Sequence, residues 1–68
     1  MENRIRDLRI KNNLTQEQLS KKVGVSRQSI VAIERGKYNP SLELAFKIAN
    51  EFDLPIEEVF IFEKGERK

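Results

Sequence analysis

The 68-residue sequence contains neither cysteine nor histidine. Their absence excludes disulfides, thiolate nucleophiles, imidazole bases and the usual zinc ligands. No apolar run reaches membrane-spanning length, and the charged N-terminal segment has no apolar region of the kind found in signal peptides. We therefore expect a cytoplasmic protein that has no membrane association, no metal and no cofactor.

The short length limits what the chain can do. A chain of 68 residues can bury one modest hydrophobic core but not a deep substrate cavity. For catalysis it offers only the acidic pair Glu57-Glu58, whose side chains on a helix would point about 100° apart and could not share one substrate. The sequence predicts one non-enzymatic domain over residues 1–62 and a flexible tail at residues 63–68.

Charge is divided unevenly along the chain. Residues 1–37 hold nine Lys and Arg against four Asp and Glu, a net charge of +5. Residues 38–68 hold four against seven, a net charge of −3. This asymmetry favours contact between the first half and a polyanion, although solvated helix faces of mixed charge would give the same count.

The first half of the chain predicts three helices. Apolar spacing indicates a helix over residues 2–11, and the two asparagines that follow, which tolerate the left-handed conformation, end it. Thr15 and Gln18 form a capping-box pattern at the start of the second helix. Gly24 suits a sharp turn, and Ser26 caps a third helix over residues 27–35.

The second half predicts two further helices and one strand. Ser41 caps a fourth helix, and Pro55 suits the first turn of a short fifth helix. Residues 59–62 are apolar, aromatic and β-branched, which is typical of a strand. Because no second strand is expected in the chain, this strand needs a partner chain or must lie against the helices.

The third helix has an outer face that suits base edges. With Ile30 and Ile33 directed inward, the opposite side carries Gln28, Val31, Ala32 and Arg35, and Arg27 occupies the exposed first turn. Glutamine can pair with adenine, arginine with guanine, and small apolar groups with thymine methyls in a major groove. An ordinary amphipathic helix with solvent-facing polar residues would show the same pattern, so this alternative stays open.

A longer pattern becomes visible from Thr15 onward. Residues 15–37 read TQEQLSKKVGVSRQSIVAIERGK and continue after Tyr38 as NPSLELAFKIA. This sequence closely resembles the Cro and phage-repressor type of helix-turn-helix regulators, also called the xenobiotic-response-element family, over residues 2 to about 60. The resemblance implies an all-α, compact five-helix, lambda-repressor-like DNA-binding domain with its helix-turn-helix motif at residues 15–35.

The resemblance also assigns site residues. The third helix would lie in the major groove, with base readout from Arg27, Gln28 and Ala32 and from the neighbouring Val31. Ala32 has only a methyl side chain, whereas the family often has a longer polar residue at this position. Base readout by Ala32 should therefore be weak or directed at thymine. Phosphate and positioning contacts are expected from Gln16, Ser26, Ser29, Arg35, Lys37, Tyr38 and Asn39.

Arg9 and Glu34 match a partly buried ion pair of the family. It joins the first helix to the end of the third. The alternative, a contact between Arg9 and DNA, is disfavoured because Arg9 shares its helix face with Ile5 and Leu8. We therefore assign this pair to stability.

The C-terminal strand is interpreted as a dimer contact. Phe60, Ile61 and Phe62 are expected to form a symmetric antiparallel strand pair between two copies, bordered by Leu44 and Phe46. The alternative is that Phe60 only caps the core and the remaining residues fold back on the chain's own surface.

The expected function is sequence-specific transcriptional regulation, with a repressor favoured. A homodimer would bind double-stranded DNA at a palindrome whose half-sites lie one helical turn apart, placing the protein at the nucleoid when bound. No small-molecule ligand is expected. An antitoxin or a restriction controller would use the same chemistry, and a protein-interaction module that has lost the DNA contact is the alternative.

Overall fold

The structure is a computed structural model that describes residues 1–62. The predicted flexible tail at residues 63–68 lies outside these described residues. Within residues 1–62, no helix is both long enough and apolar enough to cross a membrane.

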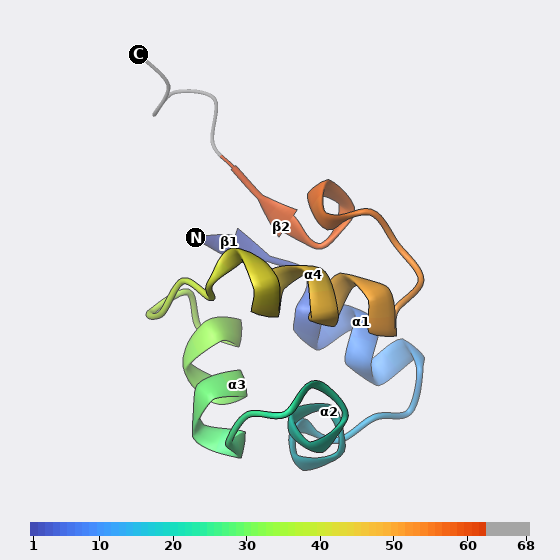
Figure 1. Cartoon of the computed structure of the whole chain (residues 1–68). Helices are drawn as coiled ribbons and strands as arrows, with labels where there is room; N and C mark the ends of the chain where they lie inside the picture. The colour runs from blue at the N-terminus through green and yellow to red at the C-terminus, as the bar shows by residue number, and fades with distance from the viewer. Residues whose placement is uncertain (63–68) are drawn as a thin grey trace.

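Four α-helices make up most of the described chain (Figure 1). Thr15, Ser26 and Ser41 precede the last three helices, and each side-chain oxygen accepts a hydrogen bond from the backbone N–H three residues later. The capping box predicted at Thr15 is confirmed, because the Gln18 side chain accepts the Thr15 N–H in return at 2.9 Å. The helices are α1 (Ile5–Lys11), α2 (Gln16–Val23), α3 (Arg27–Glu34) and α4 (Leu42–Glu51).

Left-handed residues end the first three helices. Asn13 follows α1 with φ 58°, which confirms that the asparagine pair stops this helix. Gly24 and Gly36 follow α2 and α3 with φ 79° and 75°. Behind α3, the N–H groups of Gly36 and Lys37 return to the carbonyls of Ile33 and Ala32, so the last turn of α3 is closed by its own chain.

The predicted fifth helix is a short 3-10 helix. Residues Ile56–Glu58 form this element, η1, so the prediction of five α-helices is wrong for residues 1–62. The N–H groups of Glu58 and Val59 bond to the carbonyls of Pro55 and Ile56, three residues back. The chain then turns into a strand, which leaves no room for a full α-helical turn.

A two-stranded antiparallel sheet joins two distant segments of the chain. Strand β1 (Glu2–Asn3) pairs with β2 (Phe60–Ile61), so that Glu2 lies opposite Ile61 and Asn3 opposite Phe60. The prediction that β2 has no partner in its own chain is therefore wrong. The same pairing corrects the helix predicted over residues 2–11, because the two residues of β1 are extended and α1 begins only at Ile5.

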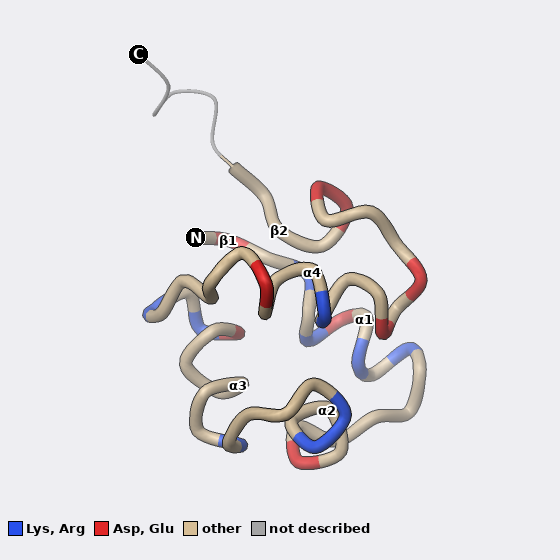
Figure 2. The backbone as a smooth tube through the Cα atoms, in the orientation of Figure 1, with Lys and Arg blue, Asp and Glu red and all other residues tan. Residues whose placement is uncertain are grey.

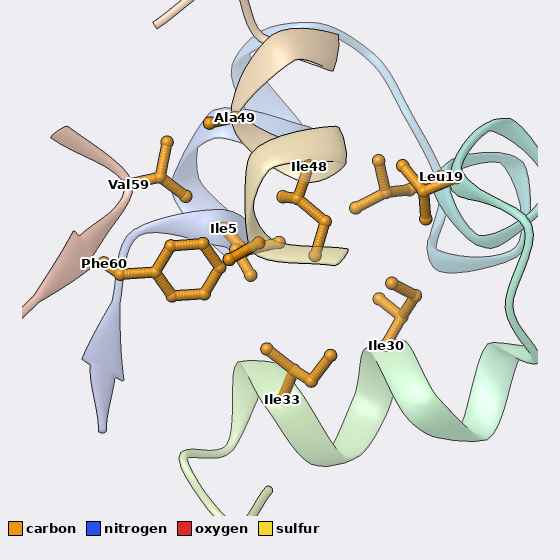
Figure 3. Packing of buried hydrophobic residues seen from close by; sticks show 10 residues of the cluster. Ile5, Leu19, Ile30, Ile33, Ile48, Ala49, Val59 and Phe60 are labelled. Atoms are coloured by element: carbon orange, nitrogen blue, oxygen red, sulfur yellow. The ribbon is translucent and has the colours of Figure 1, made fainter. Parts of the chain in front are cut away.

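One hydrophobic core joins the helices to the sheet. Ile30 and Ile33 point from α3 towards Ile48 of α4, and Leu19 enters from α2 (Figure 3). Phe60 of β2 closes the opposite end of the core beside Ile5. The buried side chains of α2 and α3 hold the angle between these two helices. The outer face of α3 lies outside this core and stays uncovered.

Candidate nucleic-acid interface

The turn between α2 and α3 is short and tightly bonded. The Ser20 carbonyl accepts hydrogen bonds from the N–H groups of both Gly24 and Val25, at 2.8 and 3.0 Å. Ser26 then caps α3 at once. Two helices joined in this way form a helix-turn-helix, whose second helix can present its outer face to a groove.

The outer face of α3 forms an open hollow on the surface. Arg27 and Gln28 are exposed, whereas Val31 and Ala32, which also line the hollow, are half-buried. The structure thus brings together the four side chains assigned from the sequence to base readout, and two assigned to positioning lie beside them. The hollow is lined by Arg27, Gln28, Val31, Ala32, Arg35 and Lys37.

A second open hollow lies at the start of α2. It is lined by Arg9, Leu14, Thr15, Gln16, Glu17 and Arg27. Because Arg27 lines both hollows, the first turn of α2 and the outer face of α3 form one continuous surface. The first N–H groups of a helix have no partner within the helix, so this turn can offer backbone donors to an anion.

Gln16 carries a structural contact that the sequence did not predict. Its side-chain amide donates to Glu34 Oε1 at 3.2 Å, and Gln16 is half-buried. Glu34 also accepts from Arg9 Nε and Nη2, at 2.6 and 3.3 Å. Arg9 Nη1 donates in addition to the Leu14 carbonyl at 2.8 Å. These bonds tie α1, the start of α2 and the end of α3 together behind the surface.

Ser26 and Ser29 lie at the start of α3. The Ser26 hydroxyl accepts the Ser29 N–H at 3.2 Å, and the two hydroxyls lie 3.2 Å apart. The Ser26 side chain therefore caps α3, and the Ser29 hydroxyl lies against this cap. Ser26 is exposed and Ser29 is half-buried, so a hydroxyl that caps the helix can still face a ligand.

The loop after α3 carries the remaining predicted positioning residues. Lys37, Tyr38 and Asn39 are all exposed. The Asn39 side-chain oxygen accepts from the Met1 amine at 3.3 Å, and the Gly36 carbonyl accepts from the same amine at 3.4 Å. The segment before β1 therefore lies directly against this loop.

Charge is distributed over the fold as the sequence count predicts. Red segments gather at η1 and the loop before it, and further red segments lie on each of the four helices (Figure 2). Blue segments lie mainly on α1, α2, the start of α3 and the loop after α3, with one on α4 (Figure 2). The acidic region lies at the end of the molecule away from the α2–α3 turn (Figure 2). A polyanion would therefore be attracted to the side that carries the helix-turn-helix.

The three residues assigned to a dimer contact lie in different environments. Phe60 is buried in the core, whereas Ile61 and Phe62 are exposed. Leu44 packs against the core, and Phe46 is exposed on α4. Ile61 and Phe62 are thus the members of the segment with apolar surface left to offer.

Comparisons with known proteins agree with this geometry. The family model described as Helix-turn-helix matches residues 5–59. An HTH-type transcriptional regulator of Methanocaldococcus jannaschii is 59% identical over 66 residues, covering 97% of this chain and 100% of that protein. A cryptic phage CTXphi transcriptional repressor of Vibrio cholerae is 38% identical over 56 residues, covering 82% of this chain and 50% of that protein.

A solved structure has the same fold. The restriction-modification controller protein C.AhdI from Aeromonas hydrophila superimposes with a TM-score of 0.77 at 37% sequence identity. The match covers 84% of this chain and 86% of that one. The family match, the relatives and the shared fold lead to one conclusion: this chain belongs to the Cro and phage-repressor type of helix-turn-helix transcriptional regulators.

Proposed function

We propose that this protein is a transcriptional repressor that binds a specific double-stranded DNA sequence with α3 in the major groove. The hollow on the outer face of α3 carries the proposal, because it combines a glutamine, arginines and small apolar groups on one exposed helix. Arginine and glutamine make bidentate pairs with guanine and adenine, and small apolar side chains contact thymine methyls. The DNA-binding domain would span residues 1–62, with its motif at residues 15–35.

Within this proposal, base readout falls to Arg27, Gln28, Val31 and Ala32. Arg27 and Gln28 occupy the first turn of α3 and are exposed, so they can reach base edges first. Val31 and Ala32 lie one turn later and offer only methyl groups, which favours contact with thymine. Specificity would then rest on few side chains in each half-site.

Contacts to the phosphate backbone of the DNA would lie on both sides of the outer face of α3. The first turn of α2 offers N–H donors beside Gln16, and Arg35 and Lys37 line the other end of the α3 hollow. Ser26, Ser29, Tyr38 and Asn39 would add contacts of the same kind. Such contacts fix the register of the protein on the duplex without reading sequence.

We further propose that two copies bind a palindrome as a homodimer. Ile61 and Phe62 are exposed at the end of β2, and exposed Leu42 and Phe46 add apolar surface on α4. Because β1 occupies one edge of β2, a symmetric partner strand would use the other edge. Two weak half-site readers joined in this way bind far more tightly than one. A regulator of this kind would act at the nucleoid, in the cytoplasm.

Selection from random-sequence DNA tests the proposed function. The wild-type protein should enrich one palindromic motif, and Arg27→Ala/Gln28→Ala should lose it. A matched control is Lys47→Ala/Asn50→Ala, which also removes one cation and one amide but acts on α4, away from both hollows. The control should enrich the wild-type motif. Selection of no motif by the wild-type protein, or of the same motif by Arg27→Ala/Gln28→Ala, would refute the proposal.

A further inference from the structure

The side chain of Asn3 connects the sheet to the end of α3. Its Nδ2 donates to the Ile33 carbonyl at 2.7 Å, and its Oδ1 accepts the Ile5 N–H at 3.2 Å. Asn3 is half-buried, and the bond to Ile33 crosses 30 positions of sequence. One amide therefore helps to begin α1 and also contacts the last turn of α3.

Asn3 is held from the side opposite to α3. It lies in β1 opposite Phe60, and the next residue, Arg4, donates its N–H to the Val59 carbonyl at 2.8 Å. Val59 and Phe60 are both buried in the core. The sheet thus holds Asn3 from its own side, in addition to the contact that Asn3 makes with α3.

The bond from Asn3 is made to the backbone of α3. The Ile33 carbonyl already accepts the Gly36 N–H at 2.9 Å, so Asn3 is an additional donor to this carbonyl. Arg9 also holds the end of α3, but it does so through the Glu34 side chain. A bond to the backbone restrains the helix axis and the direction in which the loop at residues 36–39 leaves it.

We infer that Asn3 is a positioning residue for DNA readout, which rests on the function proposed above. By fixing the Ile33 carbonyl, Asn3 holds the second turn of α3, and with it Val31 and Ala32, at a set depth in the groove. Arg27 and Gln28 lie in the first turn, which the short connection to α2 already holds. Loss of the Asn3 contact should therefore weaken readout by the second turn more than readout by the first.

Asn3→Ala tests this inference, with Asn12→Ala as its matched control. Asn12 Nδ2 donates to the Leu8 carbonyl at 2.7 Å, which is the same bond at the same distance near the end of a different helix, α1. Binding would be measured on the selected operator and on its single-base variants, at a temperature where circular dichroism shows each variant fully folded. Bases read by the first turn are those that Gln28→Ala ceases to discriminate, and bases read by the second turn are those that Val31→Ala ceases to discriminate.

Asn3→Ala should bind the operator about three- to tenfold more weakly, the effect of about one hydrogen bond. It should lose preference at the bases read by the second turn and keep preference at those read by the first. Asn12→Ala should keep the wild-type preference at both sets. A general loss of stability alone would not change the pattern of base preference.

Asn3→Ser separates the bond to the Ile33 carbonyl from the bond to the Ile5 N–H. A serine hydroxyl can accept the N–H two residues later, but it is too short to reach Ile33. It should therefore give the same binding defect as Asn3→Ala with a smaller loss of stability, and it serves the comparison if Asn3→Ala does not fold. Wild-type affinity and preference in the folded variants would overturn the inference, whereas failure of the wild-type protein to select any motif would overturn the proposed function instead.

Discussion

Arg9 and Glu34 form a buried ion pair between the first helix and the end of the third. Arg9 Nε lies 2.6 Å from Glu34 Oε2, and the two side chains are only 11% and 6% exposed. Gln16 and the Leu14 carbonyl take part in the same network. The charges are therefore held by hydrogen bonds as well as by each other, which is the condition under which a buried pair is tolerated.

Glu34→Gln should destabilise the protein strongly. It removes the negative partner and leaves the Arg9 charge buried without compensation, which costs about 3–5 kcal/mol. Urea unfolding followed by circular dichroism measures this free energy. The control is Glu17→Gln. The Glu17 carboxylate lies 3.7 Å from Lys21 Nζ on an exposed face, so its loss should change the free energy of unfolding by less than about 0.5 kcal/mol. Equal stability of the two variants would contradict the assignment of the pair to stability.

Lys37→Ala should reduce the salt dependence of DNA binding. If Lys37 contacts a phosphate, its removal lowers the slope of log affinity against log salt by about 1, because about one fewer counterion is released. Titrations at several salt concentrations measure the slope. Lys47→Ala removes the same charge from α4, outside the α3 hollow, and should leave the slope close to that of the wild-type protein. An unchanged slope for Lys37→Ala would exclude its phosphate contact.

Gly36→Ala should destabilise the end of α3. Gly36 has φ +75°, a conformation that costs an L-residue about 1–2 kcal/mol. An added Cβ would lie 3.4 Å from the Met1 carbonyl oxygen, an ordinary contact distance, so strain rather than a clash causes the loss. Gly24 has a similar φ of +79°, and a Cβ added there would meet no atom within 4 Å, so Gly24→Ala is the control. Thermal unfolding should show a similar loss of stability for both variants. A much larger loss for Gly36→Ala would mean that contact with the segment before β1 matters as well.

Phe62→Ser should weaken the proposed homodimer. Phe62 directly follows β2 and is 56% exposed, and loss of its apolar surface removes part of the contact between copies. Sedimentation equilibrium of the wild-type protein and the variant measures the dimer dissociation constant. Ile10→Ser is the control, because Ile10 is equally exposed, at 55%, but lies on α1. A monomeric wild-type protein, or equal constants for Phe62→Ser and wild type, would refute this interface.

Local signals in the sequence predicted the starts of α2, α3 and α4, whereas the pairing of β1 with β2 could not be predicted from them. The long-range pair Arg9–Glu34 was predicted only through the family resemblance. Thr15, Ser26 and Ser41 are followed by helices because a capping bond spans only three residues. Glu2 and Asn3, in contrast, have low strand propensity, and they are extended because β2 pairs with them from the other end of the chain. The spacing of apolar residues within residues 2–11 cannot indicate this pairing, because the partner strand lies at the other end of the chain.

The candidate site shows the same division. The outward face of α3 follows from helical spacing, so the sequence alone groups Arg27, Gln28, Val31 and Ala32 on one surface. The bond from Gln16 to Glu34 and the bond from Asn3 to Ile33 each join residues that no local pattern relates. An asparagine two residues before a helix start is a weak signal for a turn, and it does not indicate contact with another helix.

The pairing of β1 with β2 bears on how the domain folds. It joins residues 3 and 60, so almost the whole chain must be closed into a loop before the sheet can form. The α2–α3 unit needs only neighbouring residues and can form early, so we expect the sheet to form after the folding transition state. Substitutions in β1 should then accelerate unfolding in stopped-flow experiments and leave the folding rate nearly unchanged. If the sheet forms late in folding, this two-residue ladder opens early in unfolding.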